Sequence, residues 1–352
     1  MQSMEEPTLG TSATEGMRVL VTGGAGYIGS HVLKELRAGE IPCVVLDNLS
    51  RGHRELVLDA DLVVGDIADR ALVRQIIGDY RIGAVMHFAA YAYVGESTAE
   101  PLTYYANNVA GTISLLTAMI ESHVKMMVFS STCATYGVPE TIPITEDHPQ
   151  RPINPYGATK LMVERILHDA NQAHGLRSVI LRYFNAAGAD PSGTIGEWHA
   201  PETHVIPLAL QVAAGHRAGV EIFGTDYPTA DGTCIRDYIH VVDLAHAHVL
   251  GLRYLEAGGP SAAFNLGNGN GFSVRQVLET VEKVTGRRVA FTTAPRRPGD
   301  PPELVGSAEK VKRVLGWAPR FDTLEAIVET AWKWHNTRPA GPIESGSETP
   351  IR

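Results

Sequence analysis

The amino-acid sequence predicts an α/β fold in which a doubly wound parallel sheet is followed by a smaller C-terminal lobe. Three observations support this prediction. Short continuous apolar runs alternate with longer helical patterns over residues 17–185, as parallel strands joined by crossover helices require. A glycine-rich turn directly follows the first apolar run. Beyond residue 185 the alternation gives way to segments rich in Gly, Pro and Asp.

Six continuous apolar runs are predicted to be the strands, because a strand with both faces buried shows no polar alternation. These runs are residues 18–22, 42–46, 62–64, 84–88, 126–130 and 179–182. The longest helices are predicted at residues 104–122 and 155–174. The second of these has Asn154 as its N-cap, Pro155 in its first turn and Gly175 at its end. Shorter helices are predicted near residues 243–254, 274–285 and 324–335.

The predicted organisation has four parts. Residues 1–16 are expected to form a flexible leader and residues 339–352 a flexible tail, because neither segment can pack an apolar core. The leader has no cationic start and no apolar stretch, which argues against a signal peptide. Residues 17–185 are expected to form the sheet domain and residues 186–338 mainly the second lobe, with part of 237–268 returning to the sheet domain.

Composition and spacing argue against several classes of protein. The chain has 352 residues, a formal net charge of −9 and no long basic run, so neither a nucleic-acid partner nor an anionic membrane surface is expected. No apolar run approaches the roughly 20 residues of a membrane span. Three well-separated cysteines fit a reduced, cytoplasmic protein. No metal is expected, since His240, His246 and His248 lack the spacing of metal-binding motifs.

The glycine-rich turn predicts a dinucleotide site. Gly23, Gly26 and Gly29 follow a predicted strand and open a predicted helix. In that context, glycines let backbone amides and the positive end of the helix approach a pyrophosphate, as in a Rossmann-type domain. The alternative is a turn that only reverses the chain.

Two aspartates after the next strands extend the dinucleotide prediction. Asp47 ends the second strand, 18 residues after the last motif glycine, where a carboxylate favours the ribose of NAD over the 2′-phosphate of NADP. Arg51 and Arg54 lie nearby and leave this choice open. Asp66 follows the third strand and is expected either to bind adenine or simply to form a turn.

Tyr156 and Lys160 form a candidate proton-transfer pair, because they lie four residues apart on one face of a predicted helix. Lowering a tyrosine pKa from about 10 to about 7 requires roughly 4 kcal/mol, and a positive charge about 4–5 Å away supplies roughly 3–4 kcal/mol at an effective dielectric constant near 20. We therefore expect Lys160 to lower the pKa of Tyr156 most of the way, with an oxidised nicotinamide supplying the rest. The alternative is a solvent-facing pair on an amphipathic helix.

Two regions are candidates for contacts to a ligand. Residues 129–137 leave the fifth strand at its carboxyl end, where open α/β sheets bind ligands. There Thr132 is expected to direct its hydroxyl at a sugar, or else to satisfy backbone amides, and Cys133 is expected to pack. In the second half, the arginines of residues 232–238 and 295–300 suit a diphosphate, or else they cap loop carbonyls.

Taken together, these motifs resemble the extended short-chain dehydrogenase/reductase family, in particular its branch that epimerises UDP-sugars at C4. The resemblance spans residues 17–338, and the further segments that carry it are residues 47–48, 94–97, 107–108, 131–132, 182–185, 226–228 and 236–240. It implies a tightly held NAD, a UDP-sugar substrate and a homodimer formed through the two long helices.

The resemblance also implies roles for particular residues. Those implied to contact NAD are Gly23, Gly26, Tyr27, Ile28, Gly29, Asp47, Asn48, Asp66, Ile67, Phe88, Ala89, Ala90, Asn107, Ser130, Lys160 and Phe184. Those implied to contact the substrate are Thr132, Tyr156, Asn185, Phe223, Arg236, Arg297, Asp300 and Leu304. Tyr156, assisted by Thr132 and Lys160, would take the 4-hydroxyl proton of UDP-glucose or UDP-galactose while a hydride leaves C4.

Departures from the family pattern leave alternatives open. Ala92 stands where some relatives have a lysine that contacts a phosphate of NAD. Leu304 stands where a large tyrosine would exclude N-acetylated sugars, so UDP-N-acetylhexosamines remain possible substrates. The sequence around Thr132 also suits a UDP-xylose/UDP-arabinose 4-epimerase. A dehydratase would need Asp and Glu where Cys133 and Ala134 stand. A catalytically silent NAD-binding scaffold is the alternative outside enzymes, and the retained catalytic residues argue against it.

Overall fold

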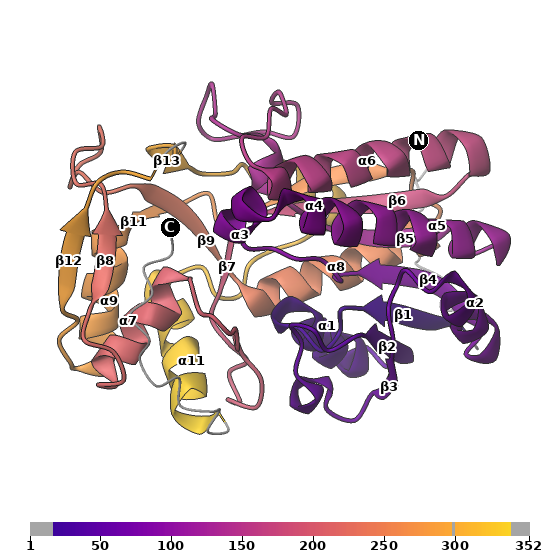
Figure 1. Cartoon of the computed structure of the whole chain (residues 1–352), viewed down its shortest axis with the longest axis horizontal. Helices are drawn as coiled ribbons and strands as arrows, with labels where there is room; N and C mark the ends of the chain where they lie inside the picture. The colour runs from indigo at the N-terminus through magenta and orange to yellow at the C-terminus, as the bar shows by residue number, and fades with distance from the viewer. Residues whose placement is uncertain (1–16, 298–299, 339–352) are drawn as a thin grey trace, which may run out of the picture.

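The computed structural model describes residues 17–297 and 300–338, and it confirms the predicted α/β fold (Figure 1). Its larger lobe contains a seven-stranded sheet of order β10-β6-β5-β4-β1-β2-β3, and all neighbouring strands are parallel. The strands are β1 (Arg18–Thr22), β2 (Cys43–Asp47), β3 (Asp61–Val64), β4 (Ile82–His87), β5 (Met126–Thr132), β6 (Arg177–Tyr183) and β10 (Ala262–Leu266). The order reverses between β1 and β4, which is the switch point where such sheets bind ligands.

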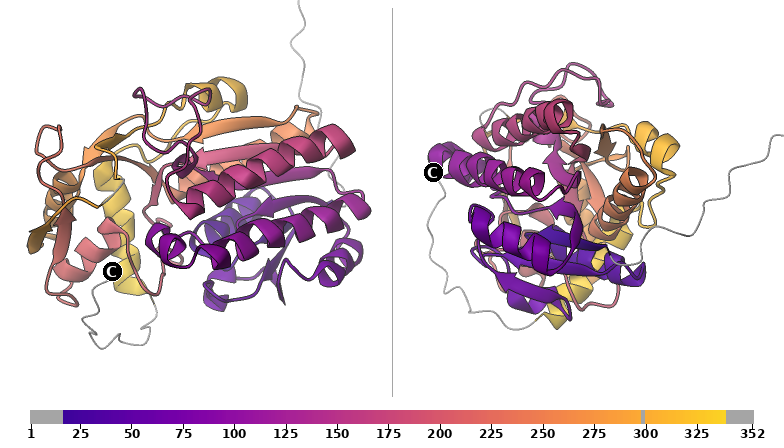
Figure 2. Two further views of the ribbon diagram at one scale, coloured as in Figure 1. Left: turned by 45° about the horizontal axis from the view of Figure 1, so that its top comes forward. Right: turned by 90° about the vertical axis from the view of Figure 1, so that its right-hand side faces the viewer.

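Helices cover both faces of this sheet, as Figure 2 shows from two further directions. One face carries α1 (Tyr27–Ala38) and α8 (Val241–Glu256), and the other carries α2 (Arg70–Asp79), α5 (Gly111–Glu121) and α6 (Pro155–His174). Successive residues of β1 serve the two faces, because Val19 and Val21 pack under α1 and α8 while Leu20 packs under α2, α5 and α6. Burial on both faces explains the continuous apolar runs of the sequence. The short segments are η1 (Arg54–Val57), α3 (Val94–Ala99) and η3 (Cys133–Thr135).

The helix predicted at residues 104–122 is interrupted in the structure. α4 (Pro101–Tyr104) leads into a π-helical segment, η2 (Tyr105–Ala110), and α5 follows it. The Asn108 side chain accepts a hydrogen bond from the Tyr91 backbone N–H at 2.9 Å and donates to its carbonyl at 3.0 Å. The prediction of one continuous helix is therefore wrong, because the wider turns that direct this buried side chain toward Tyr91 leave no signal in helical periodicity.

The smaller lobe combines helices with short strands. α7 (Val205–Ala213), α9 (Val274–Thr285) and α11 (Leu324–Thr337) share one apolar core. The strands of this lobe are β7 (Asn185–Ala187), β8 (Val220–Phe223), β9 (Ile235–His240), β11 (Gly271–Ser273), β12 (Phe291–Ala294) and β13 (Glu303–Leu304). β9 pairs with β7, β11 and β13, and β8 pairs with β12.

The chain passes between the lobes several times. β6 leads into β7 of the smaller lobe, and β9 leads into α8 of the larger lobe. The segment expected to return to the sheet domain thus supplies α8 and β10. α10 (Glu309–Leu315) also packs on the larger lobe, where the Trp317 Nε1–H donates to the Asp243 carbonyl at 3.0 Å. The sequence prediction did not include this last return.

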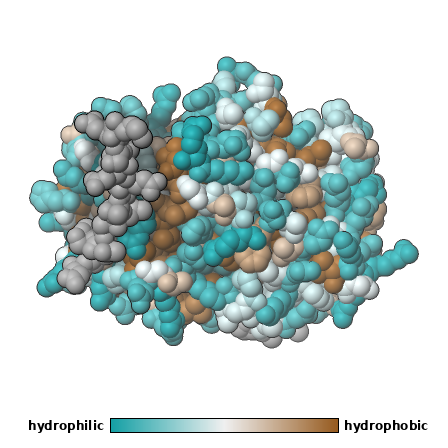
Figure 3. Space-filling model, turned by 180° about the vertical axis from the view of Figure 1, so that it is seen from behind, coloured by the Kyte–Doolittle hydropathy of each residue, from teal (hydrophilic) through white to brown (hydrophobic). Residues whose placement is uncertain are grey.

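The described surface is mixed in character. The face shown in Figure 3 intersperses hydrophilic and apolar residues. None of the helices in the described part of the chain combines the length and the apolar character that crossing a bilayer requires. The predicted leader at residues 1–16 and the predicted tail at residues 339–352 lie outside the described residues.

Candidate cofactor and active site

One pocket opens at the carboxyl ends of the central strands and extends to the smaller lobe. Every residue that the resemblance assigns to NAD lines this pocket. Thr132, Tyr156 and Asn185 of the predicted substrate set line it as well. The structure therefore brings together residues from six separate strand ends and from α6, although the individual contacts to a ligand remain predictions.

The glycine-rich turn packs too closely on its surroundings for side chains. Gly23 has a φ of +75°, and a Cβ there would lie 2.5 Å from the backbone nitrogen of Ala89. A Cβ on Gly29 would lie 2.3 Å from the carbonyl oxygen of Gly23. Gly26 is the N-cap of α1 and provides no side-chain cap. The first amides of α1 consequently border the pocket without a competing acceptor, as pyrophosphate binding requires.

The predicted adenosine end of the pocket is built from three polar side chains. The Asp47 carboxylate accepts hydrogen bonds from the Ala25 N–H at 2.9 Å and the Leu49 N–H at 2.8 Å. Burial raises the pKa of Asp47 although both amides favour its ionised form. Asn48 donates to Asp66 Oδ2 at 2.9 Å, and the other oxygen of Asp66 accepts from a backbone amide two residues on. Asp66 thus forms the turn that was one alternative and also lines the pocket.

Local sequence fixes where α6 begins. The Asn154 side chain accepts from the Gly157 N–H at 2.8 Å, which confirms the predicted cap. A Cβ on Gly157 would lie 2.4 Å from the carbonyl oxygen of Ala134, so the first turn of α6 packs directly on the turn after β5. Residues of α6 and of β5 therefore meet at one wall of the pocket.

Lys160 and Tyr156 line that wall together. The Lys160 side chain is buried, and its Nζ donates to the Ser130 carbonyl at 2.7 Å and lies 6.0 Å from the centre of the Tyr156 ring. Burial raises the pKa of Tyr156 to about 12, while the neighbouring Thr132 hydroxyl lowers it. Burial lowers the pKa of Lys160 to about 7. The expectation that Lys160 brings the Tyr156 pKa most of the way to 7 is therefore wrong, because burial has the largest effect on this pKa and Lys160 is not among the groups that lower it.

A buried ion pair supports this wall from beneath. Glu164 of α6 accepts from the Nη2 of Arg182 at 2.7 Å and from its Nε at 3.0 Å. The Arg182 Nη1 donates to the Tyr136 hydroxyl at 2.9 Å, and that hydroxyl donates to Asn265 at 2.7 Å. The network joins α6, β6, β10 and the turn after β5, and so it holds the turn that carries Thr132.

The other predicted substrate residues form a second group beside the pocket, outside its lining. Arg236 Nη2 donates to Asp300 Oδ1 at 2.6 Å, and the Arg297 guanidinium carbon lies 3.9 Å from the centre of the Phe223 ring. Leu304 pairs with Arg236 across β13 and β9 and packs in an apolar cluster that reaches the pocket wall. Residues 298 and 299 of this loop lie outside the described part of the chain.

The structure adds Arg51 and two aromatic residues to the pocket. The guanidinium carbon of Arg51 lies 5.4 Å from the centre of the Tyr91 ring and 5.2 Å from that of Tyr93. Its Nη2 lies 2.5 Å from Glu96 Oε1. Sequence reasoning considered Arg51 only in the choice between NAD and NADP. Arg51 thus places a positive charge over the two rings that flank Ala92. The lysine that the resemblance gives some relatives at position 92 is the signal that could have pointed to a positive charge here.

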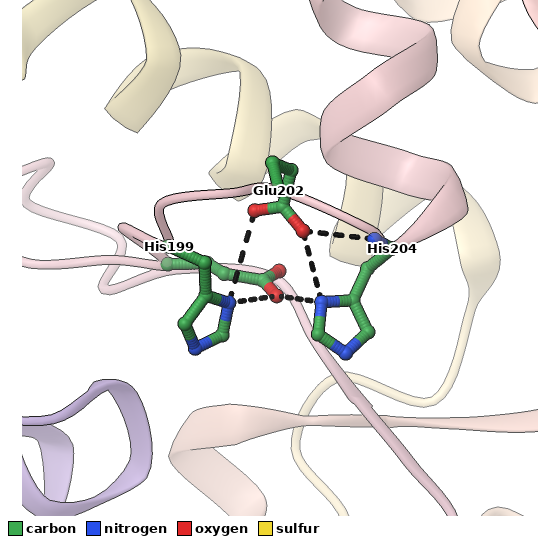
Figure 4. A group of neighbouring side chains, drawn as sticks. His199, Glu202 and His204 are labelled. Atoms are coloured by element: carbon green, nitrogen blue, oxygen red, sulfur yellow. Dashed lines mark hydrogen bonds and ion pairs between the residues drawn. The ribbon is translucent and has the colours of Figure 1, made fainter. Parts of the chain in front are cut away.

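A further set of pocket residues was missed entirely. Glu197, His199 and His204 line the pocket on the side of the smaller lobe. Together with Glu202 they bring two imidazoles and two carboxylates to one point (Figure 4). The signal in the sequence is the density of such side chains, since all four fall within residues 197–204.

Comparisons with known proteins agree with this geometry. The chain matches the NAD dependent epimerase/dehydratase family over residues 19–267. It is 55% identical over 326 residues to a UDP-glucose 4-epimerase of Halalkalibacterium halodurans, a match that covers 92% of this chain and 97% of that protein.

Solved structures show the same similarity in three dimensions. The UDP-glucose 4-epimerase of Brucella ovis in complex with NAD is 50% identical with a TM-score of 0.87, over 89% of this chain and 97% of that one. A UDP-glucose-4-epimerase of Stenotrophomonas maltophila with bound NAD and formylated UDP-arabinopyranose is 42% identical with a TM-score of 0.88, over 91% and 98%. The similarity extends over both lobes.

Proposed function

Because the chain belongs to the NAD dependent epimerase/dehydratase family, we propose that it is an NAD-dependent enzyme that interconverts UDP-glucose and UDP-galactose by inverting C4 of the sugar. The observation that carries the proposal is that Tyr156, Lys160 and Thr132 line the same pocket as the glycine-rich turn. Relatives named UDP-glucose 4-epimerase, at 50% and 55% identity over most of both chains, support this choice of substrate.

The residues of the pocket fit NAD. The turn at Gly23 and Gly29 has no space for a Cβ, which suits the close approach of a pyrophosphate to the backbone. Asp47 lies at the end of β2, where its carboxylate suits ribose hydroxyls and repels a 2′-phosphate. NAD, when bound, supplies the hydride acceptor and the hydride donor of the reaction.

Tyr156 is the proposed proton acceptor. Burial raises the pKa of its hydroxyl, and a positive charge bound beside it would lower that pKa and favour the phenolate. Tyr156 then removes the proton of the 4-hydroxyl, with Thr132 as a hydrogen-bonding neighbour, while C4 loses a hydride and becomes a carbonyl carbon. In the return step Tyr156 gives the proton back to the oxygen as C4 regains the hydride.

Inversion at C4 requires the sugar to turn while the nucleotide stays bound. Arg236 and Arg297 carry charges and donors that suit a diphosphate. Both lie beside the pocket and outside its lining, so the substrate is held chiefly at a distance from C4. The 4-keto sugar can then rotate within the pocket and receive the hydride on its opposite face.

A wider sugar range is the second candidate. The relative from Stenotrophomonas maltophila was solved with formylated UDP-arabinopyranose, which supports a pentose substrate for this chain as well. Leu304 packs beside the pocket wall and is shorter than the tyrosine expected to exclude N-acetylated sugars. UDP-xylose, UDP-arabinose and UDP-N-acetylhexosamines are therefore the alternatives to test.

The deciding experiment is to incubate the purified protein separately with UDP-galactose, UDP-N-acetylgalactosamine and UDP-xylose without added cofactor. Products are resolved by chromatography and proton NMR. Formation of UDP-glucose from UDP-galactose is the expected result, and the other two reactions define the sugar range. Absence of conversion with each sugar, even after NAD is added, would favour the silent NAD-binding scaffold.

We further propose a homodimer in the cytoplasm. An apolar groove runs between α5 and α6, which lie side by side (Figures 1 and 2), and Ile113, Leu116 and Ile166 contribute to it. Ile113 and Met162 on these helices are 46% and 43% exposed. Such exposed apolar side chains support a subunit contact across both helices. The three cysteines are free, which is compatible with a reducing compartment.

A further inference from the structure

Four side chains of residues 197–204 converge at the rim of the cofactor pocket (Figure 4). One ligand-type atom from each of Glu197, His199, Glu202 and His204 lies within 4.8 Å of the other three. The His199 Nδ1 lies 3.0 Å from Glu197 Oε1 and 3.8 Å from Glu202 Oε2. The His204 Nδ1 lies 2.8 Å from Glu197 Oε1 and 2.9 Å from Glu202 Oε1. Each imidazole nitrogen therefore faces both carboxylates.

We propose that these four side chains bind one divalent transition-metal ion, with Zn²⁺ as the best match. In a tetrahedral site with bonds of about 2.0–2.2 Å, neighbouring ligand atoms lie about 3.3–3.6 Å apart. Three of the four nitrogen–oxygen distances of the cluster are 2.8–3.0 Å and the fourth is 3.8 Å, so shifts of a few tenths of an ångström would bring the four groups to this separation. Two imidazoles and two carboxylates suit Zn²⁺, whereas Mg²⁺ and Ca²⁺ prefer oxygen ligands alone. Two carboxylates also balance the charge of a divalent ion.

Contacts around the cluster hold the ligands in place. Glu202 Oε1 accepts hydrogen bonds from the backbone N–H groups of the next two residues, at 2.7 and 2.8 Å. The Trp334 Nε1–H of α11 donates to the Glu197 carbonyl at 2.9 Å. Between the ligands, the Trp198 ring stacks on His53 of the larger lobe at 4.1 Å between ring centres. The hydrogen bonds to Glu202 orient its carboxylate, as around metal ligands. The Trp334 hydrogen bond and the Trp198 stacking tie the segment to both lobes.

A metal-free cluster of two ion pairs is the competing explanation. Although burial opposes protonation, Glu197 and Glu202 raise the pKa of His199 to about 9 and raise that of His204 as well. Two protonated imidazoles would then balance the two carboxylates. Two ion pairs need only one carboxylate for each imidazole, whereas the convergence of all four groups on one point is what a shared metal ion requires.

The position of the cluster indicates a structural role for the ion. Glu197, His199 and His204 line the cofactor pocket, and the His199 ring lies 6.1 Å from that of Tyr27 and 5.7 Å from that of Tyr93. Four protein ligands leave no open coordination position, as in structural zinc sites. The ion would fasten residues 197–204 against the pocket and stabilise the folded state that binds it.

The test begins with the full chain produced without a histidine tag, since a tag would bind metal itself. Zinc is measured by mass spectrometry of the purified protein, and about one Zn²⁺ for each chain is expected. After treatment with a chelator, Co²⁺ is titrated and its visible absorption spectrum is recorded. An intense tetrahedral spectrum that saturates at about one Co²⁺ for each chain supports the site and does not depend on any variant.

Two double variants locate the metal. We expect H199A/H204A to lose the bound zinc and the Co²⁺ spectrum, whereas H168A/H216A, which removes two exposed histidines outside the cluster, should keep both. Zn²⁺ should also raise the melting temperature of the chelated wild-type chain but not that of H199A/H204A. Less than 0.1 zinc for each chain with no Co²⁺ spectrum, or equal zinc in both variants, would overturn the proposal and leave the two ion pairs. These readouts require no turnover, so they are independent of the proposed reaction.

Discussion

Among single residues, Tyr156 bears most directly on the proposed chemistry. Tyr156→Phe keeps the ring that lines the pocket and removes the hydroxyl that accepts the proton. We expect kcat to fall by about 10²–10⁴-fold, with NAD still bound. Turnover of UDP-galactose and NAD released on denaturation measure the two effects. Tyr80→Phe, outside the pocket, is the control, and near-normal turnover of Tyr156→Phe would refute the assignment of the base.

Lys160 should make the stability of the protein depend on pH. Burial lowers its pKa to about 7, whereas lysine in an unfolded chain titrates near ~10.4. Between these values the unfolded chain binds more protons than the folded protein, so the free energy of unfolding rises with pH. We expect this group to contribute a rise of about 2 kcal/mol between pH 7 and pH 9.

Urea unfolding of the wild-type chain and of Lys160→Met at both pH values measures this contribution. The wild-type chain should gain about 2 kcal/mol relative to the variant as the pH rises from 7 to 9. An equal pH dependence in the two proteins would show that the ammonium group keeps its ordinary pKa.

Residues with local signals were predictable from the sequence, and others were not. The glycine turn and the Tyr156–Lys160 spacing are encoded within a few residues, so their grouping in one pocket followed from strand and helix positions. The predicted lowering of the Tyr156 pKa was wrong, because the burial that raises this pKa depends on segments far away in the sequence. His240, His246 and His248, which lack metal-binding spacing in the sequence, each contact a different partner.

The turn between β1 and α1 offers a direct test of the dinucleotide site. A Cβ on Gly29 would lie 2.3 Å from the Gly23 carbonyl oxygen. Gly29→Ala must therefore displace the turn from which α1 starts. We expect the NAD content of the purified protein to fall by about tenfold, which a loss of about 1.4 kcal/mol of binding free energy produces.

Gly78→Ala is the matched control, because this glycine lies in α2 and a Cβ there meets nothing within 4 Å. It should leave the NAD content unchanged and stabilise the helix by up to about 1 kcal/mol. Equal NAD content in Gly29→Ala and in the wild-type chain would show that the cofactor does not depend on this turn.

Six strands of the large sheet were predictable, because a strand buried on both faces has a continuous apolar run in the sequence. The seventh strand, β10, was not among the predicted runs. The N-cap at Asn154 and the glycine end at Gly175 likewise bounded α6 correctly. The π-helical segment before α5 was not predictable. Its geometry accompanies a hydrogen bond from Asn108 to Tyr91, and Tyr91 lies outside the segment. The return of α10 to the larger lobe was missed because its seven residues carry too few turns for a clear period.

The groove between α5 and α6 predicts where two subunits would make contact. Ile113→Glu places a charge on this face and should convert the dimer to a monomer of 37.9 kDa in light scattering after gel filtration. Val314→Glu on α10 is the control, because Val314 is 40% exposed and lies outside the groove. A wild-type chain that is already monomeric, or an Ile113→Glu chain that stays dimeric, would contradict this contact.

The arrangement of the two lobes was only partly predictable. The end of the alternation between apolar runs and helical patterns near residue 185 indicated a second lobe. Pairs such as Arg236 and Asp300, however, join residues that lie 64 positions apart, so no local sequence signal predicts them. Their grouping depends on β9 pairing with β13. Long-range pairing of this kind follows from tertiary packing and not from periodicity.

The repeated passage of the chain between the lobes limits how the protein can move. With β6–β7, β9–α8 and the segments around α10 all connecting the two parts, the lobes are joined by several short tethers side by side. A wide swing about one hinge would stretch all of them at once, so it is disfavoured relative to local loosening at the pocket rim. Exchange of a large cofactor would therefore be slow compared with small rotations of a bound sugar, and one cofactor molecule could serve many successive turnovers without leaving.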